Sequence, residues 1–229
     1  MFNFDFKSHD FKSPGYLKCS LPENVKKEVE RTIKMLNNNE VESKDYRENL
    51  AGHLQKETSF PITEKLKYLV ESLCDEYVSL FLEEDSGQYH RDCRKQLVED
   101  GYEFKHILRS LWINYGKKHD FNPIHHHHGK FSFVLWVKIP YRLEDEDKVY
   151  PYANGTDAGR FTFIYPESNS IYPIANTHVP SVEWDLILFP ATLSHSVYPY
   201  FTSDEERVSI SGNIYFEPVK SKKKKRKKK

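Results

Sequence analysis

NPIHHHHGKFSFVLWVKIP, residues Asn122–Pro140, joins four consecutive histidines to an apolar run with the composition of a β-strand. Imidazole is the commonest side-chain ligand for transition metals. Successive side chains of a strand point to opposite faces, so His125 and His127 share one face. Two histidines at positions i and i+2 can bind one ion from a strand. The stretch therefore predicts a metal site, and the alternative is a solvated polar run at a strand end.

A third histidine follows a second strand-like run. His195 lies in FPATLSHSVYP, directly after the apolar segment Asp185–Phe189. An imidazole from a different strand would complete one face of an octahedral iron site and leave positions open for other ligands. Taken alone, His195 also fits a purely structural role.

The segment RVSISGNIYF, residues 207–216, alternates between polar and apolar side chains. The apolar parity requires a packed layer, which the helices can provide, and the polar parity then faces the interior of a barrel. A guanidinium at the head of the polar row suits a carboxylate. The alternative is a half-exposed sheet face with a surface arginine. The polar row consists of Arg207, Ser209, Ser211 and Asn213, and the apolar row of Val208, Ile210, Ile214 and Phe216.

The two parts of the chain differ in their hydrophobic pattern. Before residue 102, apolar residues recur at helical spacing in 23–39, 45–57 and the segment after Pro61, and Tyr16–Leu21 is a candidate strand. From residue 102 onward, about seven short β-rich runs are separated by turns. This pattern predicts an antiparallel sandwich or barrel with the earlier helices packed outside it.

These segments together resemble the iron(II)- and 2-oxoglutarate-dependent oxygenases, most closely the compact, prolyl-hydroxylase-like branch found in phages and bacteria. NPIHHHHGKFSFVLWVKIP, DLILFPATLSHSVYPY and ERVSISGNI carry the resemblance, which covers about residues 105–216. It implies a mainly β protein with N-terminal helices, a double-stranded β-helix (jelly roll) with helices packed on one side.

The resemblance also implies a role for each residue of the motifs. His125 and His127 occupy the first metal motif, His195 is the distal metal ligand, and Arg207 with Ser209 binds the far carboxylate of 2-oxoglutarate. Three further residues are candidates for the pocket lining: Trp112, Asn114 and Asn213.

One position departs from the family pattern. The family at large has Asp or Glu two residues after the first histidine, and this chain has His127 there. Three neutral ligands would leave iron more electron-poor, or leave a coordination position open as in halogenating relatives. Asp120, five residues before His125, could supply the missing carboxylate ligand, but this spacing on a strand is wrong for binding the same metal ion.

The implied activity uses Fe(II), 2-oxoglutarate and O₂ to hydroxylate an unidentified substrate, with release of succinate and CO₂. Two other classes of function fit the same residues. One is a non-enzymatic, cupin-like β-barrel that binds metal or is purely structural. The other is a nucleic-acid-binding accessory protein that acts through a basic tail.

The expected organisation is a helical supporting region over 1–101, the oxygenase core over 102–219 and a disordered basic tail over 220–229. The tail holds nine of the 34 basic residues, so the rest has 25 against 34 acidic residues and a net charge of −9. Such a tail can bind nucleic acid or another polyanion, and in a nucleated host it can direct the protein to the nucleus.

The composition also bears on the compartment. No apolar run approaches the roughly 20 residues that a membrane span needs, and the N-terminus lacks the pattern of a secretory signal. The three cysteines are scattered and odd in number. We therefore expect an intracellular, cytoplasmic protein without a disulfide framework.

Overall fold

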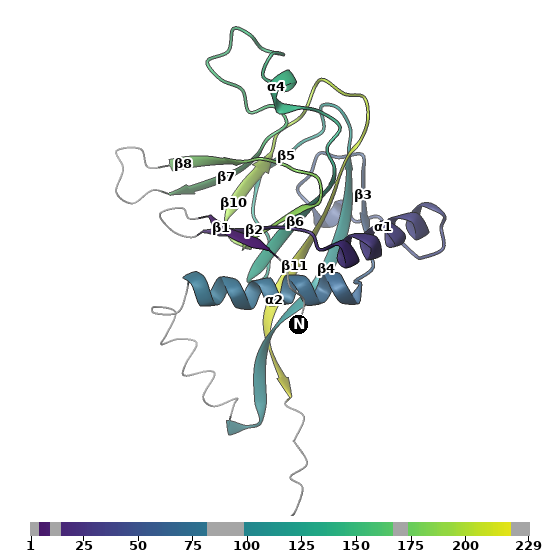
Figure 1. Cartoon of the computed structure of the whole chain (residues 1–229), viewed down its shortest axis with the longest axis vertical. Helices are drawn as coiled ribbons and strands as arrows, with labels where there is room; N and C mark the ends of the chain where they lie inside the picture. The colour runs from purple at the N-terminus through teal and green to yellow at the C-terminus, as the bar shows by residue number, and fades with distance from the viewer. Residues whose placement is uncertain (1–4, 10–14, 82–98, 167–173, 221–229) are drawn as a thin grey trace, which may run out of the picture.

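Antiparallel β-strands dominate the computed structural model, which describes residues 5–9, 15–81, 99–166 and 174–220 (Figure 1). The larger sheet has seven strands in the spatial order β1 (Phe6–His9), β2 (Tyr16–Ser20), β9 (Asp185–Pro190), β6 (Phe131–Lys138), β11 (Arg207–Lys220), β4 (Tyr102–Gly116) and β3 (Lys56–Ser59). The smaller sheet has four strands in the order β5 (Asn122–His125), β10 (Ser194–Val197), β7 (Phe161–Pro166) and β8 (Ile174–Val179).

The eight strands from β4 to β11 form a jelly roll. The chain passes from β4 in the larger sheet to β5 in the smaller sheet and returns to the larger sheet as β6. It then forms β7 and β8 in the smaller sheet, β9 in the larger, β10 in the smaller and β11 in the larger. Each sheet thus receives four of the eight strands, in the orders β4-β11-β6-β9 and β5-β10-β7-β8. This winding is that of a double-stranded β-helix, so the predicted fold class is confirmed.

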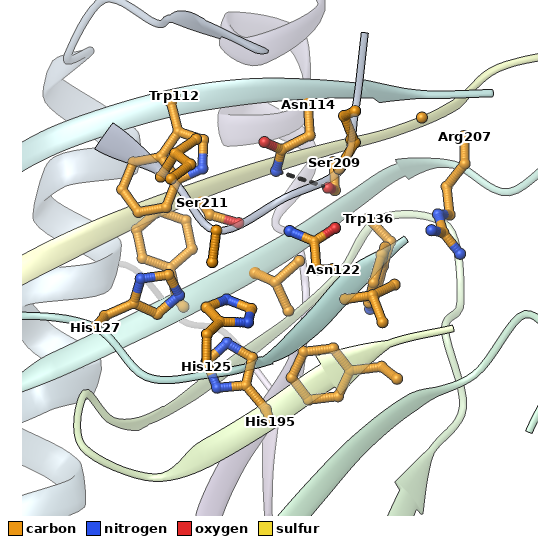
Figure 2. Close-up of a pocket in the computed structure, with 18 of the residues that line it drawn as sticks. Trp112, Asn114, Asn122, His125, His127, Trp136, His195, Arg207, Ser209 and Ser211 are labelled. Atoms are coloured by element: carbon orange, nitrogen blue, oxygen red, sulfur yellow. Dashed lines mark hydrogen bonds between the residues drawn. The ribbon is translucent and has the colours of Figure 1, made fainter. Parts of the chain in front are cut away.

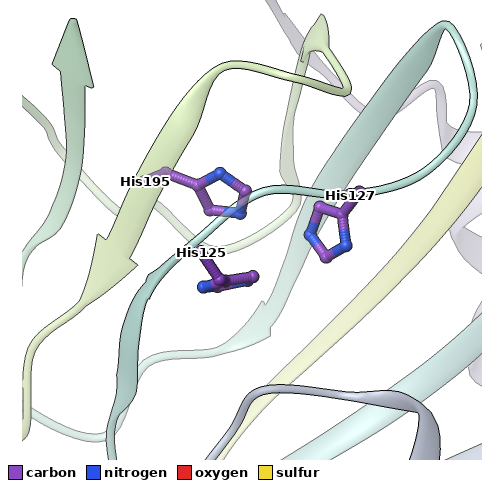
Figure 3. A group of neighbouring side chains, drawn as sticks. All are labelled: His125, His127 and His195. Atoms are coloured by element: carbon purple, nitrogen blue, oxygen red, sulfur yellow. The ribbon is translucent and has the colours of Figure 1, made fainter.

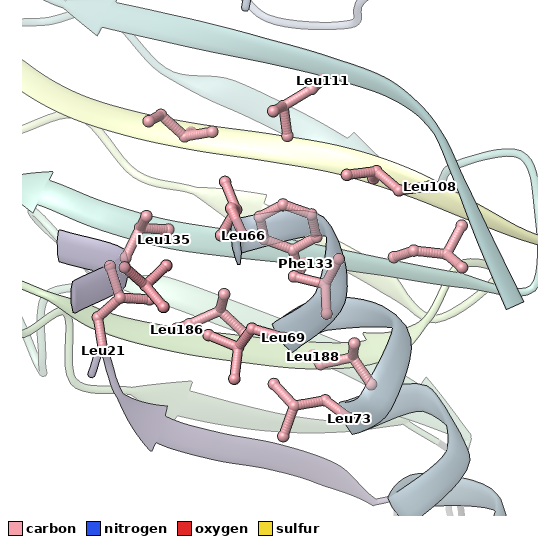
Figure 4. Packing of buried hydrophobic residues seen from close by; sticks show 14 of the residues in the cluster. Leu21, Leu66, Leu69, Leu73, Leu108, Leu111, Phe133, Leu135, Leu186 and Leu188 are labelled. Atoms are coloured by element: carbon pink, nitrogen blue, oxygen red, sulfur yellow. The ribbon is translucent and has the colours of Figure 1, made fainter. Parts of the chain in front are cut away.

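Two helices cover the larger sheet on the face away from the smaller sheet (Figure 1). They are α1 (Glu23–Asn37) and α2 (Glu64–Phe81). Their apolar stripes, which include Val25 and Val29 of α1 and Leu66, Leu69 and Leu73 of α2, pack on leucines of the sheet (Figure 4). Residues three and four apart lie on one face of a helix, so these spacings place each stripe against the sheet.

The alternation of side chains divides the core into two layers. On β6, Phe133 and Leu135 face the helices, whereas Val134 and Trp136 lie between the two sheets. On β11, Ile210 joins the helix-side layer, as the polar and apolar parities of residues 207–216 predicted. The polar residues of β11 therefore lie on its opposite face, which points into the jelly roll.

The helix predicted over residues 45–57 is wrong. That segment contains a short 3₁₀ turn, Arg47–Asn49, and then strand β3, which pairs with β4 from Lys56↔Tyr115 to Ser59↔Trp112. The Asp45 side chain accepts hydrogen bonds from the backbone and guanidinium of Arg47, which favours a turn. Pairing with the edge of β4 then satisfies backbone groups that a helix would have paired internally.

Strands from the first 101 residues lie at both edges of the larger sheet. β1 and β2 extend it beyond β9, and β3 extends it beyond β4. The strand expected at Tyr16–Leu21 is present as β2, and the proposed boundary between residues 101 and 102 stays a prediction. Of the basic tail, residues 221–229 lie outside the described part of the chain. In the described part, no helix combines the length and the apolar character needed to cross a membrane.

Short connections at one end of the jelly roll are held by a buried carboxylate. Glu146, in the short helix α4 (Leu143–Glu146), is fully buried. It accepts hydrogen bonds from the backbone N–H groups of Phe201 and Thr202 and from the Thr202 hydroxyl. This fixes the loop that leads into Arg207 at the start of β11.

Candidate active site

Pairing of β5 with β10 brings two of the predicted metal ligands together. His125 and His195 are directly opposed partners in this antiparallel pair. His127 lies two residues beyond the end of β5, where its backbone N–H donates to the carbonyl of Ala191 at 2.8 Å. The three rings converge, with centroids 4.3 to 5.0 Å apart (Figure 3). One nitrogen of each ring lies within 4.8 Å of the others.

Backbone carbonyls fix the tautomers of two of these rings. Nδ1 of His125 donates to the carbonyl of Pro123 at 2.7 Å, and Nδ1 of His195 donates to that of Leu193 at 2.9 Å. A carbonyl can only accept, so Nδ1 carries the proton in both rings. The lone pair of Nε2 is then free to bind a metal, in the arrangement common around metal-bound histidines.

Burial keeps the three imidazoles neutral. It lowers the pKa of His125 and lowers that of His127 to about 3, with the neighbouring histidines adding to the effect. The pKa of His195, which is 3 % exposed, lies well below its usual range for the same reasons. Neutral imidazoles need no deprotonation before they bind a metal, so this donor set fits a transition-metal ion such as iron(II).

Arg207 lies in the same pocket and has no counter-ion in the described part of the chain. Its side chain is 4 % exposed, and among the residues described no carboxylate is within ion-pair distance of it. One guanidinium nitrogen, Nη1, donates to the Tyr141 hydroxyl and the Tyr198 carbonyl, both at 3.1 Å. The absence of a side chain at Gly116 leaves room beside Nε and Nη2. A buried cation without a counter-ion is costly, so this end of the pocket suits a carboxylate of a ligand.

A narrow pocket joins the histidines to Arg207 (Figure 2). Water can occupy about 40 Å³ of it. Its polar wall comes from the inner face of β4 and β11, where Asn114 donates to the Ser209 hydroxyl at 3.2 Å. Its apolar wall comes from aromatic and aliphatic side chains, Trp136 and Phe189 among them.

The structure brings most of the predicted site residues into this one pocket. The residues that line it include His125, His127, His195, Arg207, Ser209, Trp112 and Asn114. Asn213 is not among them. It lies beyond Ser211 on β11, next to an irregularity in the pairing with β4, so the polar row leaves the pocket before reaching it. Asp120 accepts a hydrogen bond from the backbone of Lys117 and is not part of the histidine group.

The sequence interpretation missed the rim of the pocket. Leu50, Ala51 and Leu54 line it from the connection between the 3₁₀ turn and β3, and Asn122 lines it from the start of β5. The helix predicted over residues 45–57 would pack outside the barrel, so the sequence does not predict that Leu50 contacts the pocket. The one available signal was Gly52, which interrupts a helical pattern.

Comparison with protein families finds a match over part of the chain. Residues 110–213 match the family described as "Putative 2OG-Fe(II) oxygenase". This segment contains the three clustered histidines and Arg207. The match places residues 110–213 among the iron(II)- and 2-oxoglutarate-dependent oxygenases, and the enzyme is an oxidoreductase of the dioxygenase type. Its cofactor is Fe(II), and its cosubstrates are 2-oxoglutarate and O₂.

Several solved structures are similar to this chain. A prolyl-4-hydroxylase from Pseudomonas putida is 14% identical, with 87% of this chain and 91% of that chain covered and a TM-score of 0.47. A prolyl hydroxylase from Trichoplax adhaerens, in complex with a peptide fragment of hypoxia inducible factor, is 14% identical, with coverage of 88% and 82% and a TM-score of 0.48. The viral collagen prolyl hydroxylase of Paramecium Bursaria Chlorella virus-1 is 11% identical, with coverage of 87% and 94% and a TM-score of 0.45. Comparison with curated proteins found no match.

Proposed function

We propose that this dioxygenase hydroxylates its substrate, with His125, His127 and His195 as the iron ligands and Arg207 with Ser209 as the binding site for the distal carboxylate of 2-oxoglutarate. One observation carries the proposal. A single pocket has three neutral imidazoles at one end and, at the other, a buried guanidinium that has no counter-ion among the described residues. When bound, iron(II) and 2-oxoglutarate supply the activation of O₂ that oxidises a substrate C–H bond, with succinate and CO₂ as by-products.

The protein's own residues orient the reactants and keep water out. The carbonyls of Pro123 and Leu193 hold two imidazoles with Nε2 free, and the Tyr141 hydroxyl and the Tyr198 carbonyl hold the guanidinium of Arg207 in place. Groups that are held before the ligand arrives lose little entropy on binding. The apolar wall of the pocket strengthens each of these electrostatic contacts by lowering the local dielectric.

A set of three histidines replaces the usual two histidines and one carboxylate. The candidate carboxylate from the sequence, Asp120, is held by the Lys117 backbone. We therefore assign three neutral ligands. Hydroxylation is the proposed outcome, and halogenation would require that His127 leave its coordination position open for a halide. Product analysis in the presence of chloride separates the two.

The proposed location is intracellular, as the cysteine pattern indicates. Cys19 and Cys74 are both buried and free, and burial raises the pKa of the Cys19 thiol to about 12. Such thiols react slowly with oxidants and disulfides.

The ligand assignment is tested by adding Fe(II) and 2-oxoglutarate to the metal-free protein without air. A visible charge-transfer band is expected, because it requires both to bind the same centre. His127→Ala should abolish the band, whereas His128→Ala, a change at an exposed neighbour, should leave it. Loss of the band in both variants, or in neither, contradicts the assignment. A cupin-like protein without this activity would bind metal but give no band that depends on 2-oxoglutarate.

The role of Arg207 is tested by the 2-oxoglutarate requirement. Arg207→Ala should raise the concentration needed for half-maximal formation of the band by about 10- to 100-fold, because hydrogen bonds to a charged group are lost. Arg142→Ala removes an exposed arginine and serves as the control. An unchanged requirement in Arg207→Ala rejects the assignment.

A further inference from the structure

A row of polar side chains continues from the pocket to a buried carboxyl group. Glu57 on β3, Asn114 on β4 and Ser209 on β11 are successive partners across the larger sheet. Directly opposed residues of antiparallel strands project from the same face. Asn114 and Ser209 line the pocket, so Glu57 is the next group in the same row, under the rim formed by residues 50–54.

This end of the row contains hydrogen-bond acceptors without donors. Glu57 is 1 % exposed, and both of its carboxyl oxygens lack a hydrogen-bond partner within the described chain. The side-chain oxygen of Asn114, Oδ1, is also buried and has no hydrogen-bond partner there. The amide nitrogen of the same side chain donates to the Ser209 hydroxyl. Buried acceptors of this kind are rare in native proteins and cost free energy unless a ligand or water satisfies them.

The other fully buried glutamate shows what a structural carboxylate looks like in this fold. Glu146 accepts three hydrogen bonds from the loop at Phe201 and Thr202. Glu57 has none of these contacts. Arg47, the cation that lowers its pKa, is held by the Asp45 carboxylate and the Gln55 carbonyl. A structural role thus leaves the carboxyl of Glu57 unexplained.

The charges around Glu57 favour a cation. Burial raises its pKa to about 7, Arg47 opposes the shift, and Asp45 and Asp120 add to it. Bringing a positive charge to this carboxyl would favour its ionised form. The whole chain without its basic tail carries a net charge of −9, which favours the approach of cationic over anionic ligands.

We propose that Glu57 and Asn114 bind a cationic nitrogen group of the substrate, a primary ammonium or a guanidinium, beside the iron site. This inference rests on the proposed function and names the substrate class for the same pocket. The N–H groups of such a cation match the three unpaired acceptors. Gly52 of the rim lies against the site: a Cβ there would be 2.7 Å from Oε1 of Glu57 and 3.0 Å from the amide nitrogen of Asn122.

The test compares probes that differ only in the ammonium group. The protein is loaded with Fe(II) and 2-oxoglutarate without air, and binding is measured by titration calorimetry. The probes are N-acetyl-lysine methylamide and its uncharged analogue N-acetyl-norleucine methylamide, with the arginine equivalent for a guanidinium. Free lysine and a short lysine-containing peptide distinguish a small-molecule source of the cation from a peptide source.

A cationic probe should bind about 10- to 100-fold more tightly than the norleucine probe, as expected for charge-assisted hydrogen bonds. Glu57→Gln should remove this preference, and Glu57→Asp should keep part of it. Glu48→Gln, the same change at an exposed position in the neighbouring turn, should preserve it fully. Equal binding of charged and uncharged probes, no binding of any cationic probe, or a preference retained in Glu57→Gln overturns the proposal.

A second measurement does not depend on affinity. Near pH 7 the cationic probe should convert the carboxylic acid of Glu57 to the carboxylate, and infrared difference spectra should show a carboxylic-acid band lost on binding. An unchanged carboxyl spectrum counts against the proposal. Failure of the proposed function would look different, because the charge-transfer band would then be missing from the unmutated protein.

Discussion

The three clustered histidines have opposite effects on metal binding and on the stability of the metal-free protein. Burial holds their rings neutral, which prepares them for a metal. In the unfolded chain the same rings are exposed and take up protons near pH 6.5. Between the folded and unfolded pKa values the unfolded state therefore binds more protons, so stability rises with pH in this window.

This linkage predicts an acid-sensitive metal-free protein. Lowering the pH from about 7 to about 5 should reduce the free energy of unfolding, with His127 contributing up to about 1.4 kcal/mol per pH unit. His127→Leu should flatten this dependence, and His128→Leu, at an exposed position, should not. Urea unfolding of the metal-free proteins at several pH values measures the effect. If the free energy of unfolding changed equally with pH in His127→Leu and in the unmutated protein, burial would not be keeping the His127 ring neutral.

At the residue scale, the sequence was most informative where the alternation of a strand fixes the direction of side chains. His125, His127 and Arg207 were predicted from their parity and motif, and they line one pocket. Their distances could not be predicted, because the pairing of β5 with β10 joins segments far apart in the chain. Glu57 was missed because an unpaired carboxyl is visible only after its surroundings are known.

At the scale of elements, α4 and the loop after β10 depend on one side chain. Without the carboxylate of Glu146, two backbone N–H groups and one hydroxyl lose their acceptor in a partly buried place. An unsatisfied buried donor costs about 1 to 3 kcal/mol. The same loop leads to Arg207, so its order also matters for the pocket.

Glu146→Ala should therefore destabilise the protein by about 3 kcal/mol or more, measured by urea unfolding. It should also weaken 2-oxoglutarate binding, because the loop before Arg207 loses its anchor. Glu144→Ala changes an exposed residue of the same helix and should alter stability by less than about 0.5 kcal/mol. Equal stabilities of the two variants would contradict the role assigned to Glu146.

Long elements with a clear period were predicted well, and the short connection before β3 was not. Helix α2 and strand β11 have unbroken apolar patterns, and both form where expected. The segment 45–57 has helix-forming residues, but the open edge of β4 offers a competing partner for its backbone. Such a choice depends on tertiary pairing, which a local pattern does not contain.

At the scale of the whole molecule, the charge is divided between an acidic body and a basic tail. Deleting residues 221–229 removes eight lysines and arginines. Any binding of the tail to a single-stranded oligonucleotide should be lost, together with its dependence on salt concentration. The charge-transfer band should be unaffected, because the pocket residues all precede the tail. Replacing the same eight residues by glutamine controls for length, and salt-dependent binding that survives both changes would refute a role for the tail.

The position of β11 in the larger sheet has a consequence for biosynthesis. β11 is the last strand of the jelly roll along the chain, yet it lies between β6 and β4. While the nascent chain is growing on the ribosome, β6 and β4 therefore each have an unpaired, aggregation-prone edge until residues 207–220 have been synthesised and have emerged. Translation pauses or premature termination before that point would therefore leave a species that depends on chaperones and has no Arg207.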